Sequence, residues 1–173
     1  MDFEPTGAID EGTSTPIVVA GRAFEHVGLS VPDLDRAVEF FVTVFGARVE
    51  FRMDRLATGT PMGAERLGLS PDVQFALAML DLGGSRIELL QWWPARADSR
   101  PLDVDVPGVA HVAIDVVDVA VALQALEAVE GVAILGETVS FDAGATPGLT
   151  NAFVRTPWGS LIELVTWRAT ERA

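Results

Sequence analysis

The sequence predicts an α+β fold of two tandem modules, each running strand, helix and then three strands. Two observations lead to this prediction. The octet SRIELLQW at 85–92 returns as SLIELVTW at 160–167. The segment FEHVGLSVPDLDRAVEFFVTVFGA at 24–47 has a counterpart in VAHVAIDVVDVAVALQALEAVEGV at 109–132, with a histidine and an aspartate at matching places. Because a pattern that recurs at one offset indicates a structural unit used twice, we expect two copies of one module.

Each module is expected to begin with a strand and a helix. Apolar residues at 27, 29 and 31 alternate with small or polar ones that include His26, as in a strand with one buried face. Asp33 is placed to cap the following helix and Gly46 to end it. The second module repeats this plan, with apolar residues at 112, 114 and 116, a capping Asp118, and Gly131 as the end of the helix.

Three further strands complete each module, and the last two form a hairpin. In the first module these strands are 47–53, 73–82 and the first octet, with the loop 54–72 between the first two. In the second they are 132–139, 150–156 and the second octet. The expected boundaries are an acidic, flexible tail at 1–21, a first module at 22–92, a linker at 93–107, a second module at 108–168 and a short tail at 169–173.

The amino-acid composition limits which side chains could carry out catalysis and which partners the chain could bind. The chain has a formal net charge of −13 and contains no cysteine, no tyrosine and no lysine. Nucleic acid is therefore not an expected partner, because its phosphates need a basic face. No apolar run is long enough to span a membrane and no signal peptide is recognisable, so a cytoplasmic protein is expected. Histidines, carboxylates, arginines and hydroxyls remain as the groups able to do chemistry.

Two histidines and two glutamates stand at matching places in the modules. His26 and His111, the only histidines, lie in the first strands, and Glu88 and Glu163 lie in the last. Taken singly, each histidine is more often a core residue, and Glu88 could pair with Arg86. Together the four can satisfy one another through a shared cation, since an unpaired buried carboxylate costs several kcal/mol. Two imidazoles and two carboxylates suit one divalent transition metal, namely zinc, nickel, cobalt, manganese or iron.

The segments EHVGLSVPDLDRAVEFF and AHVAIDVVD, each followed by an IEL strand, resemble the vicinal oxygen chelate superfamily over residues 22–168. Its members include glyoxalase I, methylmalonyl-CoA epimerase, extradiol dioxygenases, and fosfomycin and bleomycin resistance proteins. The resemblance implies modules whose strands form a curved, incompletely closed mixed sheet around a metal site. It places the metal ligands at His26, Glu88, His111 and Glu163. This set is similar to the isomerase branch, although methylmalonyl-CoA epimerases tend to have glutamine where Glu88 stands.

The expected function is that of a metal-dependent isomerase or epimerase acting on a small substrate with vicinal oxygens. A cation with four protein ligands keeps about two positions for substrate oxygens, and it acidifies the C–H beside a carbonyl by stabilising the enolate. Because lysine and tyrosine are absent, carboxylates are the candidate bases. Glu163 is the expected base, with Glu88 acting from the opposite side of the substrate.

Three alternatives stay open. A glyoxalase I-like lyase acting on a hemithioacetal would use the same metal chemistry. A non-haem iron dioxygenase would use two histidines and one carboxylate, together with further histidine and tyrosine residues that this chain lacks. A binding or resistance protein would hold a small molecule without turnover.

Aromatic and arginine side chains are the candidate substrate contacts, because the loops 54–72 and 140–149 should border the site. A homodimer is expected, since a partner readily completes an open sheet with exposed edges. The modules could pair within one chain or swap between two chains. The candidate substrate residues are Arg52, Arg86, Trp92, Phe141, Phe153, Arg155 and Trp167.

Overall fold

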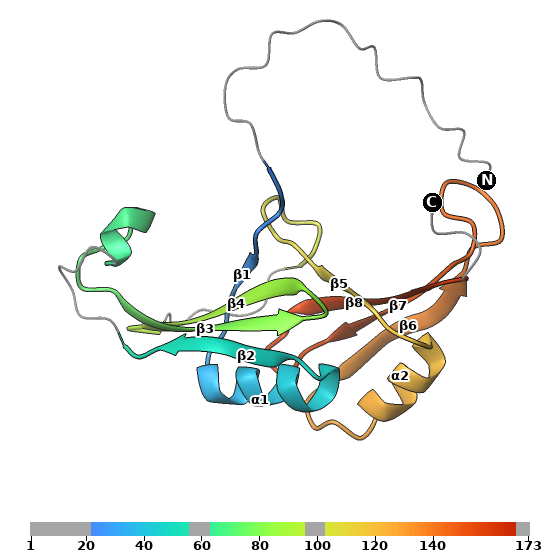
Figure 1. Cartoon of the computed structure of the whole chain (residues 1–173), viewed down its shortest axis with the longest axis horizontal. Helices are drawn as coiled ribbons and strands as arrows, with labels where there is room; N and C mark the ends of the chain where they lie inside the picture. The colour runs from blue at the N-terminus through green and yellow to red at the C-terminus, as the bar shows by residue number, and fades with distance from the viewer. Residues whose placement is uncertain (1–21, 56–62, 96–102, 169–173) are drawn as a thin grey trace, which may run out of the picture. The chain divides into compact units, whose positions relative to one another are not determined.

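The structure is a computed structural model that describes residues 22–55, 63–95 and 103–168 of the 173-residue chain. The described residues form two compact units, called module 1 (22–95) and module 2 (103–168) from here on (Figure 1). The expected tails at 1–21 and 169–173 lie outside the described residues. So do parts of the expected linker and of the loop 54–72. No helix among the residues described is long and apolar enough to cross a membrane.

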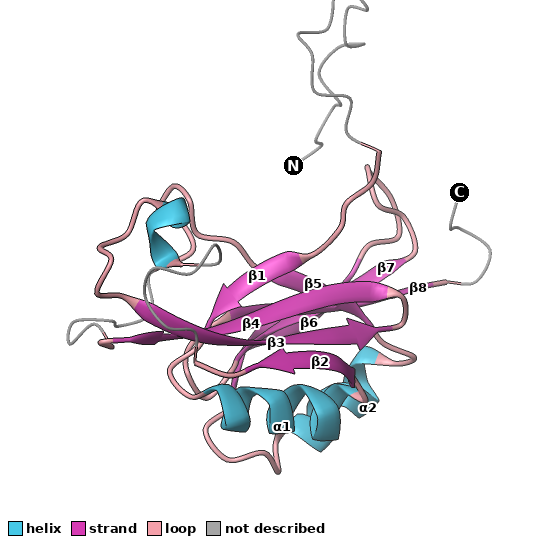
Figure 2. Ribbon diagram, turned by 60° about the vertical axis from the view of Figure 1, so that its left-hand side comes forward, coloured by secondary structure: helices cyan, strands magenta, loops and turns pink. Residues whose placement is uncertain are grey.

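Module 1 contains one four-stranded mixed sheet and one long helix. Its strands lie in the order β1-β4-β3-β2, with β1 parallel to β4 and the other neighbours antiparallel. The helix α1 lies against one side of this sheet (Figure 2). The elements are β1 Val27–Ser30, α1 Leu34–Phe45, β2 Arg48–Met53, the 3₁₀ turn Ala64–Leu67, β3 Gln74–Leu82 and β4 Ser85–Trp93.

Module 2 repeats the same plan. Its sheet has the order β5-β8-β7-β6, again with one parallel pair, β5 and β8. The predicted α+β class and the βαβββ order of both modules are confirmed, and neither four-stranded sheet closes into a barrel within the described residues. The elements are β5 Val112–Asp115, α2 Val119–Leu126, β6 Ala133–Ser140, β7 Leu149–Arg155 and β8 Leu161–Trp167.

The helices begin where the sequence predicts. The carboxylate of Asp33 accepts from the amide of Arg36 at 3.0 Å, and that of Asp118 accepts from the amide of Val121 at 2.9 Å. Each satisfies an amide that the first turn leaves without a helical partner. Gly46 ends α1 with a φ of 69°, in the left-handed region that glycine enters without strain.

The end of α2 differs from the expectation. The helix stops at Leu126 instead of continuing to Gly131. The amide of Val129 bonds the carbonyl of Leu126 at 3.0 Å, and the amide of Val132 bonds that of Val129 at 3.2 Å. These three-residue turns satisfy the terminal carbonyls in place of a further α-helical turn.

The core of each module lies between its helix and one face of its sheet. In module 1, Phe41 of α1 and Leu89 of β4 are fully buried, as are Val119 of α2 and Leu164 of β8 in module 2. Because side chains alternate along a strand, burying Leu89 on the helix side turns its neighbour Glu88 to the other side. The same alternation turns Glu163 away from the core of module 2. Both carboxylates thus lie on the faces that the helices leave uncovered.

Replacing Gly131 by alanine is expected to lower the free energy of unfolding by about 1–2 kcal/mol, because its φ of 80° disfavours any side chain. A Cβ there would also lie 3.1 Å from the Cβ of Pro157. Gly144→Ala is the matched control, with a φ of 92° but no atom within 4 Å of the added carbon. Urea unfolding should show the larger loss for Gly131→Ala. Equal losses would mean that the contact with Pro157 adds nothing.

Candidate metal-binding pairs

In module 1, the fold brings His26 and Glu88 together. His26 lies one residue before β1, and Gly28 of β1 stands opposite Glu88 in the parallel pairing with β4. Residues two apart on a strand share a face, so His26 and Glu88 lie on the same side of the sheet. The Nε2 atom of His26 is 3.7 Å from a carboxylate oxygen of Glu88. His26 and Glu88, which are 62 residues apart in the sequence, are therefore neighbours in the fold.

Module 2 builds the equivalent pair. Ala113 of β5 stands opposite Glu163 of β8, and His111 precedes the strand by one residue. The Nε2 atom of His111 is 3.2 Å from Oε2 of Glu163. The ring of Phe153 meets the His111 ring edge to face, with the centroids 6.0 Å apart. The side chain of Glu163 is only 15% exposed, so its charge needs a partner.

The two pairs fit the ligands of a divalent transition metal. Imidazole nitrogen and carboxylate oxygen bind such ions at about 2.0–2.2 Å, which places two neighbouring ligand atoms about 3.0–3.4 Å apart. The pair of His111 and Glu163 falls in this range, and that of His26 and Glu88 is slightly wider. Among the described residues, no group of three or more histidine, aspartate or glutamate side chains could hold a metal ion. Each module by itself therefore offers two ligands.

In module 1, further hydrogen bonds hold the histidine of the pair. One carboxylate oxygen of Glu25 is hydrogen-bonded to the Nδ1 atom of His26, and the other accepts a hydrogen bond from Arg86. Arg86 also donates from Nε to Glu50 at 2.8 Å. The hydrogen bond with His26, and then the charge of Arg86, hold the pKa of Glu25 below its ordinary value. Arg86 is thus paired with Glu25 and Glu50, and Glu88 keeps its approach to His26.

The pair in module 2 is supported through its carboxylate. Asn151 of β7 donates from Nδ2 to Oε1 of Glu163 at 2.7 Å, which leaves Oε2 toward His111. Sequence reasoning singled out neither Asn151 nor Glu25. Asn151 carries a weak signal, as a polar residue directly before the apolar run 152–154, but only the strand register reveals its partner. Phe153 stands opposite Glu163, so Asn151, two residues earlier, shares its face.

The predicted substrate residues take different places around the two pairs. Arg52 stands opposite the buried Ala78, on the α1 side of the sheet, and pairs with Asp35. Trp92 near the end of β4 packs on Phe75 with ring centroids 5.0 Å apart and donates to Ser30 at 2.9 Å. The remaining residues are placed as follows: Arg86 in the ion pairs with Glu25 and Glu50, Phe141 directly after β6, Trp167 at the end of β8, and Phe153 and Arg155 on β7.

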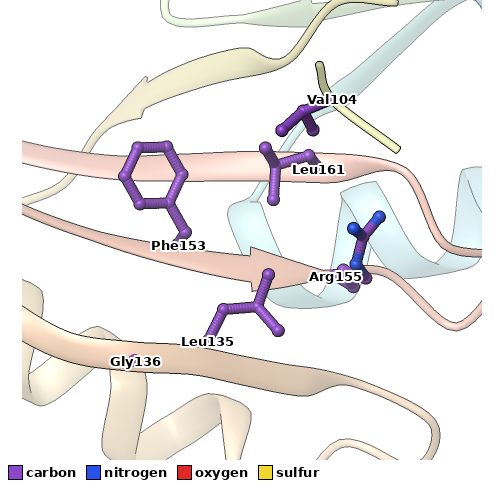
Figure 3. A pocket seen from close by; sticks show the side chains of 6 residues that line it. All are labelled: Val104, Leu135, Gly136, Phe153, Arg155 and Leu161. Carbon is purple, nitrogen blue, oxygen red and sulfur yellow. The ribbon is translucent and has the colours of Figure 1, made fainter. Parts of the chain in front are cut away.

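A pocket of about 390 Å³ opens on the face of module 2 that carries Glu163 (Figure 3). Phe153 connects the pocket to the pair, because it lines the pocket and stands opposite Glu163 in the register. The lining is almost wholly apolar. The pocket residues are Val104, Leu135, Gly136, Phe153, Arg155 and Leu161.

Comparison with known proteins places these features in a family context. Residues 25–147 match the model of the glyoxalase/bleomycin resistance protein/dioxygenase superfamily. A 2-epi-5-epi-valiolone epimerase from an Actinomyces species is 37% identical over 147 residues, which cover 83% of this chain and 78% of that protein. The range 25–147 of the family match includes His26, Glu88 and His111.

Solved structures agree with the fold. A glyoxalase family protein from Bacillus cereus is similar with a TM-score of 0.73 and 26% identity, covering 88% of this chain and 98% of that one. A fosfomycin resistance protein from Listeria monocytogenes, solved with Mn(II) and a sulfate ion, is similar with a TM-score of 0.51. It is 16% identical over 88% of this chain and 98% of its own, so this likeness concerns the fold alone.

Proposed function

The chain belongs to the glyoxalase/bleomycin resistance protein/dioxygenase superfamily, and on that basis we propose that it is a metal-dependent epimerase. Its reaction is a proton transfer at a carbon beside a carbonyl. The observation that carries the proposal is the approach of one histidine to one glutamate in each module, at 3.7 Å and 3.2 Å. The 37% identity to an epimerase supports the same reaction class.

His26, Glu88, His111 and Glu163 would together hold one divalent cation, with one pair from each module. The modules that supply the pairs belong to one chain or to two chains of a homodimer. When bound, such a cation polarises the substrate carbonyl, which is worth several kcal/mol of charge stabilisation in the transition state. The two histidines would bind through Nε2, the atom that approaches the carboxylate in each pair.

Glu163 acts as the base in this proposal and would leave the cation transiently to take the proton. Asn151 holds one of its oxygens at 2.7 Å, so the position of the other oxygen is fixed before substrate arrives. A base held in place avoids the entropy loss of positioning it during the reaction. Glu88, protonated before the reaction, would then donate its own proton to the other face of the carbon, which inverts the configuration. Glu163 would release the proton it took to water, and Glu88 would take up a new one from water, so that both carboxylates are reset.

The direct test uses 2-epi-5-epi-valiolone, the compound in the relative's name, as the first substrate. The protein is loaded with zinc, nickel, cobalt, manganese or ferrous iron and incubated with the compound in heavy water. We expect deuterium at the carbon beside the carbonyl and a second epimer, both detected by NMR. Chelator-treated protein is the control and should show neither. Absence of exchange with all five metals, on this compound and on simple 2-hydroxy ketones, would rule out the proposal.

Glu25→Gln is expected to weaken metal binding by about ten-fold, because partners that orient a ligating histidine typically contribute ten- to hundred-fold in affinity. Glutamine keeps an oxygen near His26 but loses the charge that favours a proton on Nδ1. Glu39→Gln is the matched control, since it makes the same change at an exposed position of α1, on the other side of the sheet from His26 and Glu88. Competition titration with Zn²⁺ measures both. Equal affinities in the two variants would show that Glu25 does not orient His26.

A further inference from the structure

The two modules differ at one equivalent corner of their sheets. In module 1, Asp81 stands opposite Arg86, and in module 2, Arg155 stands opposite Leu161. Both positions on the last strand lie two residues before the glutamate of the pair, on the same face. In module 1 this corner is ionic: Arg48 reaches Asp81 at 3.4 Å and Arg86 reaches Glu50 at 2.8 Å. The salt bridges fill the corner next to Glu88.

In module 2 the corner is apolar and open. Leu161 takes the place of Arg86, and Leu135 stands at the register position of Phe51, next to Glu50, the extra residue at the bulge of β2 in module 1. With these two leucines and Phe153, the corner becomes the pocket of about 390 Å³ (Figure 3). Arg155 contributes to its wall, but its NH1 group donates to the carbonyl of Gly159 at 3.1 Å. The pocket therefore offers hydrocarbon surface and almost no polar group.

The pocket begins beside the proposed base. Phe153 stands opposite Glu163, and its ring contacts that of His111 with centroids 6.0 Å apart. A substrate carbon at Glu163 thus has its next substituent against Phe153 and Leu161. The volume falls within the range of roughly 300–1,000 Å³ that is usual for small-molecule sites. An apolar lining favours hydrocarbon by about four-fold in affinity for each CH₂ group that it buries.

We propose that this pocket is a subsite for an apolar part of the substrate. The substrate class is then a 2-hydroxy ketone that carries a hydrocarbon ring or chain beside its two oxygens. The inference rests on the proposed function, since Glu163 marks where the reacting carbon lies. It assigns unequal roles to the modules: module 2 holds the body of the substrate, while the salt-bridged corner of module 1 has no room for it.

Two simple ketones test the subsite. 2-Hydroxycyclohexanone and hydroxyacetone share the vicinal oxygens, and only the former has a hydrocarbon ring. NMR titration of the Zn²⁺-loaded full chain should show the ring compound binding at least about ten-fold more tightly, given the three additional carbons. Methyl signals of Val104, Leu135 and Leu161 should shift, in contrast to those of Leu77 and Leu90 in module 1. Equal affinities, or shifts confined to module 1, would overturn the subsite but leave the proposed function standing. If neither ketone binds, both the subsite and the proposed function are overturned.

Leu161→Arg together with Leu135→Glu puts an arginine and a glutamate into the pocket of module 2, in imitation of the ion pair between Arg86 and Glu50 in module 1. We expect this double variant to lose the preference for 2-hydroxycyclohexanone and to bind hydroxyacetone as before. Val121→Arg is the control, because it adds a charge to an exposed position on α2 and should keep the preference. Zn²⁺ titration checks that each variant retains its metal site. If the double variant does not fold, the single variant Leu161→Gln, which makes a smaller change to the pocket, is tested in its place. A preference retained in a folded pocket variant would overturn the proposal.

Discussion

Replacing Glu163 by glutamine is expected to lower the rate of substrate deuterium exchange by about a hundred- to ten-thousand-fold, the usual contribution of a general base. Glutamine has nearly the same shape and keeps an oxygen that can accept from Asn151, which lies 2.7 Å from the native carboxylate. It cannot take up the proton. The loss should therefore appear in turnover, with the protein still folded and much of its metal affinity retained.

The variant Asn151→Leu separates the role of Glu163 as a base from the positioning of its carboxylate. Leucine stands at the matching position of module 1, as Leu77, so the change is compatible with the fold of the module. This variant should slow exchange by a smaller factor, because the base is kept and only its positioning is lost. Exchange is followed by NMR at saturating metal for both proteins. An unchanged rate in Glu163→Gln would remove Glu163 from the role of base.

His111→Ala is expected to abolish tight metal binding, with a loss well beyond the ten- to hundred-fold that supporting residues contribute. His26→Ala should have the same effect, because both pairs hold the same cation in our proposal. The double variant should then be little worse than either single variant, since residues that act on one ligand are not additive. Calorimetric titration with Zn²⁺ measures all three. A single variant that keeps one full-affinity site would instead show that each pair binds its own ion.

The repeat in the sequence was sufficient to predict the fold of the two modules and to single out the two histidines and two glutamates, whose sharing of one cation stays a prediction. Alternation in the first strands set His26 apart from the apolar face, and the capping aspartates Asp33 and Asp118 located the helix starts. These features follow from local chemistry and the two-residue period of a strand, so a single sequence contains them. The observed distances of 3.7 Å and 3.2 Å within the pairs agree with that reasoning.

The partners of the pairs could not be predicted in the same way. Asn151 meets Glu163, and Glu25 bridges His26 and Arg86, only because of strand register and side-chain direction. The end of α2 at Leu126 could not be predicted either, because it depends on which carbonyl each amide after the helix bonds. The aligned octets already match Leu161 with Arg86, but the open corner of module 2 could not be predicted, because Leu135 and Phe153 reach it only through strand pairing.

In our proposal, the two histidine–glutamate pairs share one cation. Elemental analysis of the purified protein, after growth with zinc, nickel, cobalt, manganese and iron supplied together, measures how many metal ions it holds. We expect about one tightly held transition metal per chain, lost in His111→Ala. Two metals per chain, or none after reconstitution with each of the five ions, would contradict it.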